Sequence, residues 1–304
     1  MDQYAVIAKD ISKAYADVEA LNHISFSVKK GELFGLIGPD GAGKSTLFRI
    51  LTSLLLPGSG SGMVENFDVV KDFKKIRKII GYMPGRFSLY QDLTVEENLN
   101  FYATIFGTTV KENYDLIRDI YVQIEPFKNR LAGKLSGGMK QKLALSCALI
   151  HKPDVLFLDE PTTGVDAVSR KEFWEMLKNL QEKGITILVS TPYMDEAGLC
   201  DRVALIQKGK ILEIDKPHNI TKRYSLPLFE VKTSRMYQLA GDLLEYASTQ
   251  SAFRFGDSIH LSLKNEETSE KEIMDYLTGK EHGQIAIRKI EANIEDCFMW
   301  LMNR

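Results

Sequence analysis

The sequence predicts an α/β domain with a largely parallel sheet, followed by a small α+β domain. The first two thirds of the chain alternate short β-rich runs with helical patterns, as expected when helices cover a parallel sheet. A length of 304 residues exceeds what one average core fills and favours about two domains. Residues 223–227, Arg-Tyr-Ser-Leu-Pro, interrupt the pattern with a proline, so we place the domains at 1–222 and 226–304.

Three short apolar runs predict the buried strands of the parallel sheet, and they are Leu33–Ile37, Val155–Leu158 and Ile185–Val189. After residue 226 the order of elements changes, and Gly256-Asp257 between two alternating runs indicates a hairpin. This order suits a ferredoxin-like α+β sandwich with one extra helix. The expected elements are strand Leu228–Lys232, helix Met236–Tyr246, two strands joined at Gly256-Asp257, helix Glu270–Leu277, strand Gln284–Ile290 and helix Ile294–Met302.

The composition is that of an ordinary globular protein, with 44% hydrophobic and 26% charged residues. A net charge of -2 offers no positive surplus to a polyanion, so nucleic acid is not expected as a partner. The apolar runs are much shorter than the roughly 20 residues of a membrane-spanning helix. The first four residues do not resemble a signal peptide, and the 3 cysteines lack disulfide or zinc spacing. We therefore expect a cytoplasmic protein.

A phosphate-binding loop is predicted at residues 38–45, which match the pattern Gly-x-x-x-x-Gly-Lys-Ser/Thr. An apolar strand precedes the loop and a helical run, Thr46–Leu51, follows it, whereas a ligand-free glycine turn would not require both. Lys44 would neutralise the β and γ phosphates of ATP, and the Ser45 hydroxyl would ligate Mg²⁺. The predicted nucleotide-binding residues here are Gly38, Pro39, Asp40, Gly41, Ala42, Gly43, Lys44, Ser45 and Thr46.

Two carboxylates, Asp159 and Glu160, follow the apolar run Val155–Leu158. Asp159 would hold Mg²⁺ through water, and Glu160 would act as the catalytic residue by polarising the attacking water. The alternative is that both acids are merely solvated at the tip of the strand. A phosphate-binding loop upstream in the same sheet favours a shared site.

Residues 135–141, Leu-Ser-Gly-Gly-Met-Lys-Gln, lie between these two motifs and resemble the signature sequence of ABC transporter ATPases, with Met139 where the consensus has glutamine. Ser136 is predicted to cap a helix that continues through Ile150, so that Ser136 and the N–H groups of Gly137 and Gly138 form an anion-binding end. The resemblance implies that this end binds the γ-phosphate of ATP held by an opposite subunit. Plain helix capping is the alternative interpretation.

The resemblance covers residues 1 to about 220 and implies a P-loop NTPase cassette, with a RecA-like core and a helical subdomain. It implies that Tyr15 stacks on adenine and that Asp166, in Gly164-Val165-Asp166, belongs to a loop between subunits. Residues 81–84, Gly-Tyr-Met-Pro, and the C-terminal residues 294–298 resemble drug-type exporters. More narrowly, residues 81–84 resemble the first cassette of tandem two-cassette ATPases, and residues 294–298 resemble the short C-terminal domain of that subfamily.

The sequence departs from the family pattern at two positions. Gly85 stands where the family has a glutamine that contacts Mg²⁺ and the attacking water. Pro192 stands where the family has a histidine that contacts the γ-phosphate, and proline offers no donor. A shift of one residue would place Tyr193 there instead. Losing one such contact typically costs about 2.7–4 kcal/mol of transition-state stabilisation, so we predict that this site binds ATP but hydrolyses it slowly.

The resemblance also implies the partners, which are membrane-spanning permease subunits and a second ATP-binding subunit. The signature would complete the partner's site, in a heterodimer or a homodimer. Residues 78–107, with a capping box at Thr94 and Glu97, are the expected docking surface for the permease on the inner face of the membrane. The competing interpretations are an active homodimeric exporter ATPase, a soluble ABC-type ATPase without transport, and a regulatory ATP-binding module.

Overall fold

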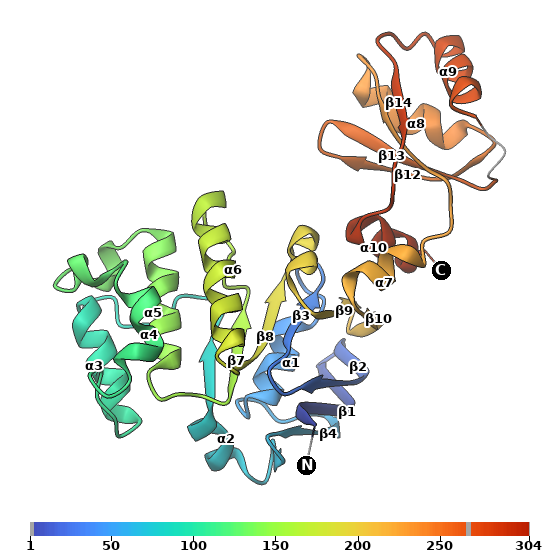
Figure 1. Ribbon diagram of the computed structural model, residues 1–304. Helices are drawn as coiled ribbons and strands as arrows, with labels where there is room; N and C mark the ends of the chain where they lie inside the picture. The colour runs from blue at the N-terminus through green and yellow to red at the C-terminus, as the bar shows by residue number, and fades with distance from the viewer. Residues whose placement is uncertain (1–2, 266–268, 304) are drawn as a thin grey trace. The chain divides into compact units, whose positions relative to one another are not determined.

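The chain forms two compact units, Met1–Pro217 and His218–Arg304, in a computed structural model that describes residues 3–265 and 269–303 (Figure 1). The short helix α7 (Pro217–Lys222) groups with the second unit, although the sequence-based bounds, 1–222 and 226–304, put it in the first. A contact explains the grouping, because the Cys297 thiol of α10 (Ile294–Met302) lies 3.7 Å from the carbonyl oxygen of Ile220 in α7.

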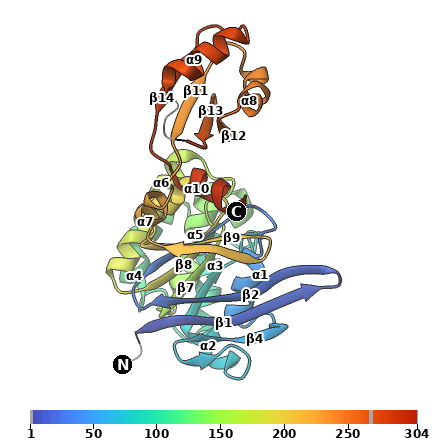
Figure 2. The same ribbon diagram turned by 90° about the vertical axis from the view of Figure 1, so that its right-hand side faces the viewer.

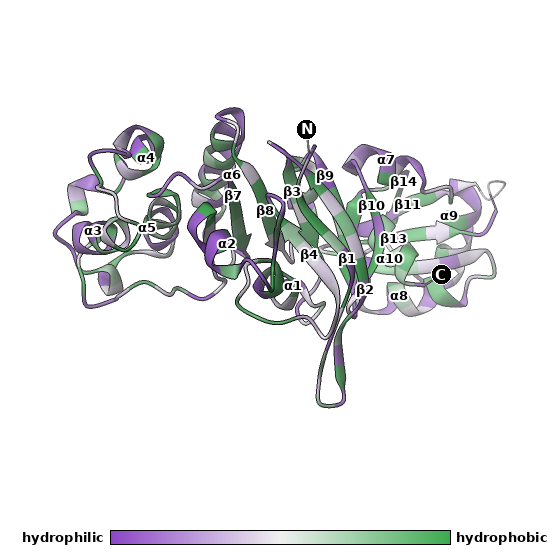
Figure 3. Cartoon of the chain, turned by 90° about the horizontal axis from the view of Figure 1, so that it is seen from below, coloured by the Kyte–Doolittle hydropathy of each residue, from purple (hydrophilic) through white to green (hydrophobic). Residues whose placement is uncertain are grey.

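The first unit is built on a six-stranded sheet with the order β10-β9-β3-β8-β7-β6. All neighbours are parallel except β10 and β9, which confirms the prediction of a largely parallel sheet, and Figure 3 shows its central strands as apolar. The strands are β3 (Leu33–Ile37), β6 (Ile80–Met83), β7 (Val155–Asp159), β8 (Thr186–Thr191), β9 (Arg202–Gln207) and β10 (Lys210–Asp215).

Strand β8 was expected at Ile185–Val189 but ends two residues later, at Thr191. The ladder continues because Ser190 and Thr191 still pair with β3, opposite Leu36 and Ile37. These two residues are polar and completely buried, so an apolar run could not reveal them. Helix α1 (Lys44–Leu51) likewise begins before the predicted Thr46.

Helices flank this sheet and add to its core. The ring of Phe48 in α1 meets that of Phe157 in β7 edge to face, at 5.6 Å between centroids. Two more helices of this part of the chain are α2 (Phe73–Ile79) and α6 (Ala167–Glu182), and the 3₁₀ helix η3 (Met194–Leu199) follows β8. None of the helices within residues 3–265 and 269–303 is long and apolar enough to cross a membrane.

A second sheet of the first unit is antiparallel, with the order β2-β1-β4-β5. Its long hairpin of β1 and β2 is clear in Figure 2. The sequence analysis predicted no such sheet. Its strands are β1 (Tyr4–Tyr15), β2 (Val18–Lys29), β4 (Ser59–Val64) and β5 (Phe67–Asp68).

A helical part lies at the end of the first unit beyond β6 and β7 (Figure 1). The predicted capping box is confirmed, because the Glu97 N–H donates to Thr94 Oγ1 at 3.2 Å and the Thr94 N–H donates to Glu97 Oε2 at 2.8 Å. Its elements are α3 (Val95–Ile105), α4 (Tyr114–Tyr121), η1 (Glu125–Phe127), η2 (Ala132–Lys134) and α5 (Gly137–Leu149).

The second unit contains an antiparallel sheet with the order β12-β13-β11-β14, which is the order of a split βαβ arrangement. Strand β14 is shorter than the predicted Gln284–Ile290, and Gln284 adopts a positive φ of 51°, outside the extended region of regular strands. The elements are β11 (Leu228–Lys232), α8 (Met236–Glu245), β12 (Thr249–Phe255), β13 (Ser258–Leu263), α9 (Glu270–Gly279), β14 (Ala286–Lys289) and α10.

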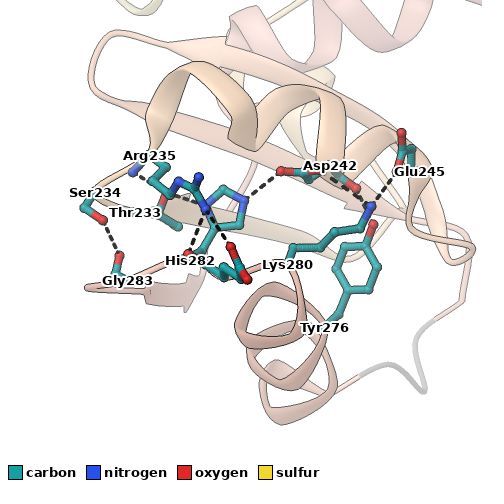
Figure 4. A network of polar contacts seen from close by, with 10 residues as sticks. Thr233, Ser234, Arg235, Asp242, Glu245, Tyr276, Lys280, His282 and Gly283 are labelled. Carbon is teal, nitrogen blue, oxygen red and sulfur yellow. Dashed lines mark hydrogen bonds and ion pairs between the residues drawn. The ribbon is translucent and has the colours of Figure 1, made fainter.

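In the second unit, the buried His282 contacts the residue after β11 and a residue of α8 (Figure 4). His282 Nδ1 lies 3.1 Å from Thr233 Oγ1, and its Nε2 lies 2.9 Å from Asp242 Oδ2 on α8. Lys280 Nζ joins the network at Asp242 Oδ1, 3.7 Å away, and donates to Glu245 Oε2 at 2.6 Å. The hydrogen bond to Glu245 raises the pKa of the lysine. The network connects α8 to the segment after α9, and nothing in it indicates a ligand.

All three cysteines, Cys147, Cys200 and Cys297, are buried free thiols, which agrees with the predicted lack of a disulfide framework. Burial raises the pKa of Cys147 and Cys200 and raises that of Cys297 to about 12. Such thiols are inert packing groups.

Candidate nucleotide-binding site

The phosphate-binding loop connects β3 to α1, as predicted. Gly43 immediately precedes α1 with a φ of 107°, and an added Cβ atom there would lie 2.5 Å from the carbonyl oxygen of Ala20. Only glycine fits such a position. Ala42 is buried and Asp40 is exposed, and the Ala42 N–H closes the turn on the Pro39 carbonyl at 3.2 Å.

Lys44 is folded into the loop and is only 3% exposed. Its ammonium donates to the carbonyl oxygens of Gly38 at 2.7 Å and Pro39 at 3.0 Å. It also forms an ion pair with Glu160 Oε1 at 3.1 Å. The predicted phosphate-binding lysine and the predicted catalytic carboxylate, 116 positions apart in the sequence, are therefore direct neighbours.

The two carboxylates differ in their surroundings. Asp159, the last residue of β7, is 3% exposed and accepts a hydrogen bond from Ser190 Oγ at 2.6 Å. Glu160 is partly exposed and adopts the left-handed conformation, with a φ of 51°. This conformation is uncommon for a residue with a side chain. It ends the strand abruptly and turns the Glu160 side chain toward Lys44.

Gly85 lies beside Asp159. A Cβ atom at Gly85 would lie 3.1 Å from the carbonyl oxygen of Asp159 and 3.9 Å from its carboxyl carbon. Tyr82, three residues earlier on β6, has its pKa raised by burial and then by the charge of Asp159. Gly85 itself adds no polar group to this flank of Asp159.

Pro192 directly follows β8 and is half-buried. The side chain of the next residue, Tyr193, packs against Arg170 of α6, with the guanidinium carbon 4.9 Å from the ring centroid. The Tyr193 N–H donates to Thr191 Oγ1 at 3.1 Å. The tyrosine is therefore engaged with α6, and the alternative in which Tyr193 replaces the missing histidine finds no support in its contacts.

The signature segment begins α5, as predicted. Ser136 is the N-cap residue and its hydroxyl accepts from the Met139 N–H at 3.4 Å. Ser136 and Gly137 are exposed, whereas Gly138 packs against α6, where an added Cβ atom would lie 2.7 Å from Ser169 Oγ. The exposed end of α5 thus presents a hydroxyl and backbone N–H groups.

Asp166 is the N-cap residue of α6. Its Oδ1 accepts from the N–H groups of Ser169 at 3.0 Å and Val168 at 3.1 Å. The hydrogen bonds from Ser169 are the main cause of its lowered pKa. The geometry therefore gives Asp166 a structural role as a helix cap, beside the intersubunit role that the family resemblance implies.

Tyr15 ends β1 next to the hairpin turn, and its side chain is 44% exposed. The ammonium of Lys13 lies 5.7 Å from the centroid of its ring. An exposed ring with a neighbouring cation is available for stacking on a planar base.

The residues present fit MgATP. Among the described residues no side chain caps the N-terminus of α1, so the first N–H groups of Lys44, Ser45 and Thr46 suit phosphate oxygens. Ser45 and Asp159 are oxygen donors of the kind Mg²⁺ uses together with phosphates and water. No group of three or more metal-binding side chains occurs in the described part of the chain, and a magnesium site completed by phosphates does not need one.

Two polar residues of the site were not found from the sequence. Ser190 contacts Asp159, and the buried Glu196 of η3 contacts Thr191 and Thr162, with 2.8 Å between Thr162 Oγ1 and Glu196 Oε1. The only signal in the sequence is the polar pair Ser190-Thr191 directly after the apolar run 185–189.

The chain is similar to known proteins in sequence and in fold. A profile of the family described as "ABC transporter" matches residues 21–163. The chain is 42% identical over 215 residues to "Probable multidrug ABC transporter ATP-binding protein YbhF" of Escherichia coli (strain K12). That alignment covers 70% of this chain and only 37% of YbhF.

The chain is also 34% identical over 308 residues to "Nod factor export ATP-binding protein I" of Burkholderia orbicola (strain AU 1054), covering 97% of this chain and 96% of that protein. Among solved structures, a dimeric post-hydrolysis state of the ATP-binding cassette MJ0796 bound to ADP and Pi has a TM-score of 0.63 and 27% sequence identity. It covers 69% of this chain and 98% of that one.

Proposed function

The chain belongs to the ATP-binding proteins of the ABC transporter family, and from that membership we propose that it is the ATP-binding subunit of a membrane exporter. The family hydrolyses ATP. The observation that carries the proposal is the buried Lys44, held at the carbonyl oxygens of Gly38 and Pro39 and beside Glu160. The name of the Nod factor export protein supports export as the direction of transport.

ATP binding is assigned to residues of three segments. Lys44 and the N-terminus of α1 hold the phosphates, Ser45 and Asp159 hold Mg²⁺, and the exposed ring of Tyr15 stacks on adenine. The bound metal would neutralise phosphate charge. Glu160 must leave Lys44 to act on water, so the ammonium can pass from a carboxylate to a phosphate without losing a charged partner.

The site is proposed to hydrolyse slowly, because Gly85 and Pro192 supply no polar side chain to the γ-phosphate side. Each missing contact is expected to lower turnover by about 10²- to 10³-fold. Glu160 remains, so some chemistry is retained.

A second cassette is the proposed partner in hydrolysis. The exposed Ser136 and Gly137 at the N-terminus of α5 can reach phosphate on another subunit, and the dimeric state of MJ0796 supports such a pairing. A heterodimer fits best, because an intact signature would complete an active site on a partner while the chain's own site stays slow. An active homodimer is the alternative.

Membrane-spanning permease subunits are the other proposed partners, with the chain on the cytoplasmic face of the membrane. A cavity of about 170 Å³ lies between β6 and α5 and includes Met83, Pro84, Phe87 and Tyr102. It falls largely within residues 78–107, the segment expected to dock. As part of this proposal, the cassette of this chain corresponds to the first cassette of tandem two-cassette ATPases.

Two non-transport functions compete with the proposal. A soluble ABC-type ATPase acting on nucleic acid is disfavoured by the net charge of -2. A purely regulatory ATP-binding module is disfavoured by Glu160, which retains a carboxylate at the phosphate end of the site.

A titration with MgATP tests binding. Lys44→Ala should weaken affinity about tenfold or more, because a charged hydrogen bond contributes about 1.5–3 kcal/mol. The matched control is Lys171→Ala, which removes an 81% exposed lysine of α6 and should bind like the wild type. If Lys44→Ala binds as tightly as the control, the assigned site is wrong.

Restoring the missing side chains tests slow hydrolysis. Gly85→Gln requires only a small shift, because the added Cβ lies 3.1 Å from the Asp159 carbonyl oxygen. The double variant Gly85→Gln/Pro192→His should raise ATP turnover about 10²-fold or more. Wild-type turnover already within the roughly 1–100 s⁻¹ of phosphoryl-transfer enzymes, or no gain in the double variant, would contradict the proposal.

A further inference from the structure

Three neighbouring strands bring their carboxyl ends to the candidate site. Strands β6, β7 and β8 are adjacent and parallel. In this register Asp159 of β7 lies directly opposite Ser190 of β8, so the two side chains leave the sheet on the same face. Ser190 is completely buried, and neither the family resemblance nor the sequence motifs gave it a role.

The Ser190 hydroxyl makes two contacts, one to each acidic residue. It donates to Asp159 Oδ1 at 2.6 Å and accepts from the Glu160 N–H at 3.0 Å. The Glu160 N–H also lies 3.0 Å from the Ser190 carbonyl oxygen. The hydroxyl therefore holds an oxygen of Asp159, and it shares the Glu160 N–H with the backbone of Ser190.

The neighbours of Asp159 leave this task to Ser190. Toward β6 the adjacent residue is Gly85, which has no side chain, and β8 is followed by Pro192, which has no donor. A buried carboxylate needs hydrogen-bond partners to stay ionised and oriented. With Oδ1 held by Ser190, the other carboxylate oxygen of Asp159 can bind a metal ion.

We propose that Ser190 is a positioning residue whose hydroxyl orients Asp159 for Mg²⁺. This inference rests on the proposed ATP-binding function. Removing the hydroxyl leaves the Glu160 N–H bonded to the Ser190 carbonyl oxygen, so the fold of the turn survives. The loss falls on Asp159, and therefore on the metal rather than on the nucleotide itself.

Calorimetric titration of the full chain with ATP, in EDTA and then over a series of Mg²⁺ concentrations, separates these effects. Ser190→Ala should bind ATP in EDTA like the wild type. Mg²⁺ should increase its affinity for ATP, but the concentration that gives half of this increase should be about tenfold higher than in the wild type. The reason is the loss of a hydrogen bond to a charged group. Ser190→Thr, which keeps the hydroxyl, should restore the wild-type Mg²⁺ dependence.

Two further variants guard against a merely structural effect. Ser146→Ala removes a hydroxyl that is equally buried and donates to the Lys142 carbonyl oxygen at 2.8 Å, and it should keep the wild-type Mg²⁺ dependence. Ser190→Cys fills the same space with a weak donor and should behave like Ser190→Ala, which keeps the test open if the alanine variant does not fold.

The outcomes are distinct. Unchanged Mg²⁺ dependence in Ser190→Ala or Ser190→Cys overturns the role of Ser190, and so does equal weakening with and without metal. Failure of the wild type to bind ATP under either condition overturns the proposed function instead.

Discussion

The buried carboxylate of Glu196 provides a quantitative test of how the strand ends at the site are held. It is 2% exposed and accepts hydrogen bonds from Thr162 Oγ1, at 2.8 Å, and from Thr191 Oγ1. Thr162 lies three residues after Asp159, the last residue of β7, and Thr191 is the last residue of β8. Glu196 thus joins the loops that leave the two strands carrying Asp159 and Ser190.

Glu196→Ala removes both hydrogen bonds, together with a 4.0 Å ion pair to Arg170 Nε, and leaves two hydroxyls without their acceptor. Each hydrogen bond to a charged group contributes about 1.5–3 kcal/mol, so the variant should lose about 3–6 kcal/mol of unfolding free energy. Glu196→Gln keeps the shape and one acceptor oxygen, and should lose about half as much. Thr162→Val should lower the unfolding free energy less in the Glu196→Ala background than in the wild type, because the contact between the two residues is already gone.

Urea unfolding followed by tryptophan fluorescence measures these losses. A Trp300→Phe background leaves Trp174 of α6 as the reporter, because the sequence contains 2 tryptophans, and the signal then comes from the first unit. Glu175→Ala is the matched control, since its carboxylate is 63% exposed and paired only at 3.9 Å with Lys171; it should leave the midpoint unchanged. A loss below about 1 kcal/mol in Glu196→Ala would refute the reasoning.

Three further predictions concern the signature, its neighbouring cap and a half-buried histidine. Gly138→Ala should lower unfolding free energy by about 1–3 kcal/mol by crowding Ser169, whereas Gly137→Ala, with its nearest foreign atom at 3.5 Å, should not. Asp166→Ala should lower the melting temperature and Asp166→Asn should restore most of it, because both native contacts are N-cap bonds. Burial lowers the pKa of His151 in the fold, so stability should fall as pH drops below about 6.5, and His151→Gln should weaken this dependence in pH-dependent melting curves.

The sequence predicted those parts of the fold whose signals are local and regular. The phosphate-binding loop and the capping residues Thr94 and Ser136 are found where short motifs placed them. The antiparallel sheet was missed for physical reasons. Strand β1 contains Asp10 with a φ of 55° and several register shifts, which break the alternation of side chains. Strand β4, Ser-Gly-Ser-Gly-Met-Val, has the composition of a loop.

Contacts within the site depend on strand register, which local patterns do not encode. The pairing of Asp159 with Ser190 arises because β7 and β8 are parallel neighbours, and no spacing in the sequence specifies that neighbour. The ion pair of Lys44 with Glu160 likewise requires the left-handed turn at Glu160. A glutamate does not favour that conformation by itself.

The positions of the two departures bear on the proposed division of labour between subunits. Gly85 follows β6 and Pro192 follows β8, on either side of the strand that carries Asp159, so both losses fall on the site that contains Lys44. The signature lies on a different element, the N-terminus of α5, where Gly138 packs against α6 and Ser136 stays exposed. A chain can therefore lose contacts in its own site while the surface offered to a partner stays intact. One result would support this separation: Gly85→Gln/Pro192→His raises ATP turnover only when the signature of a second cassette is also intact. The contacts made within the Lys44 site and the signature supplied by the partner would then be separate elements of one mechanism.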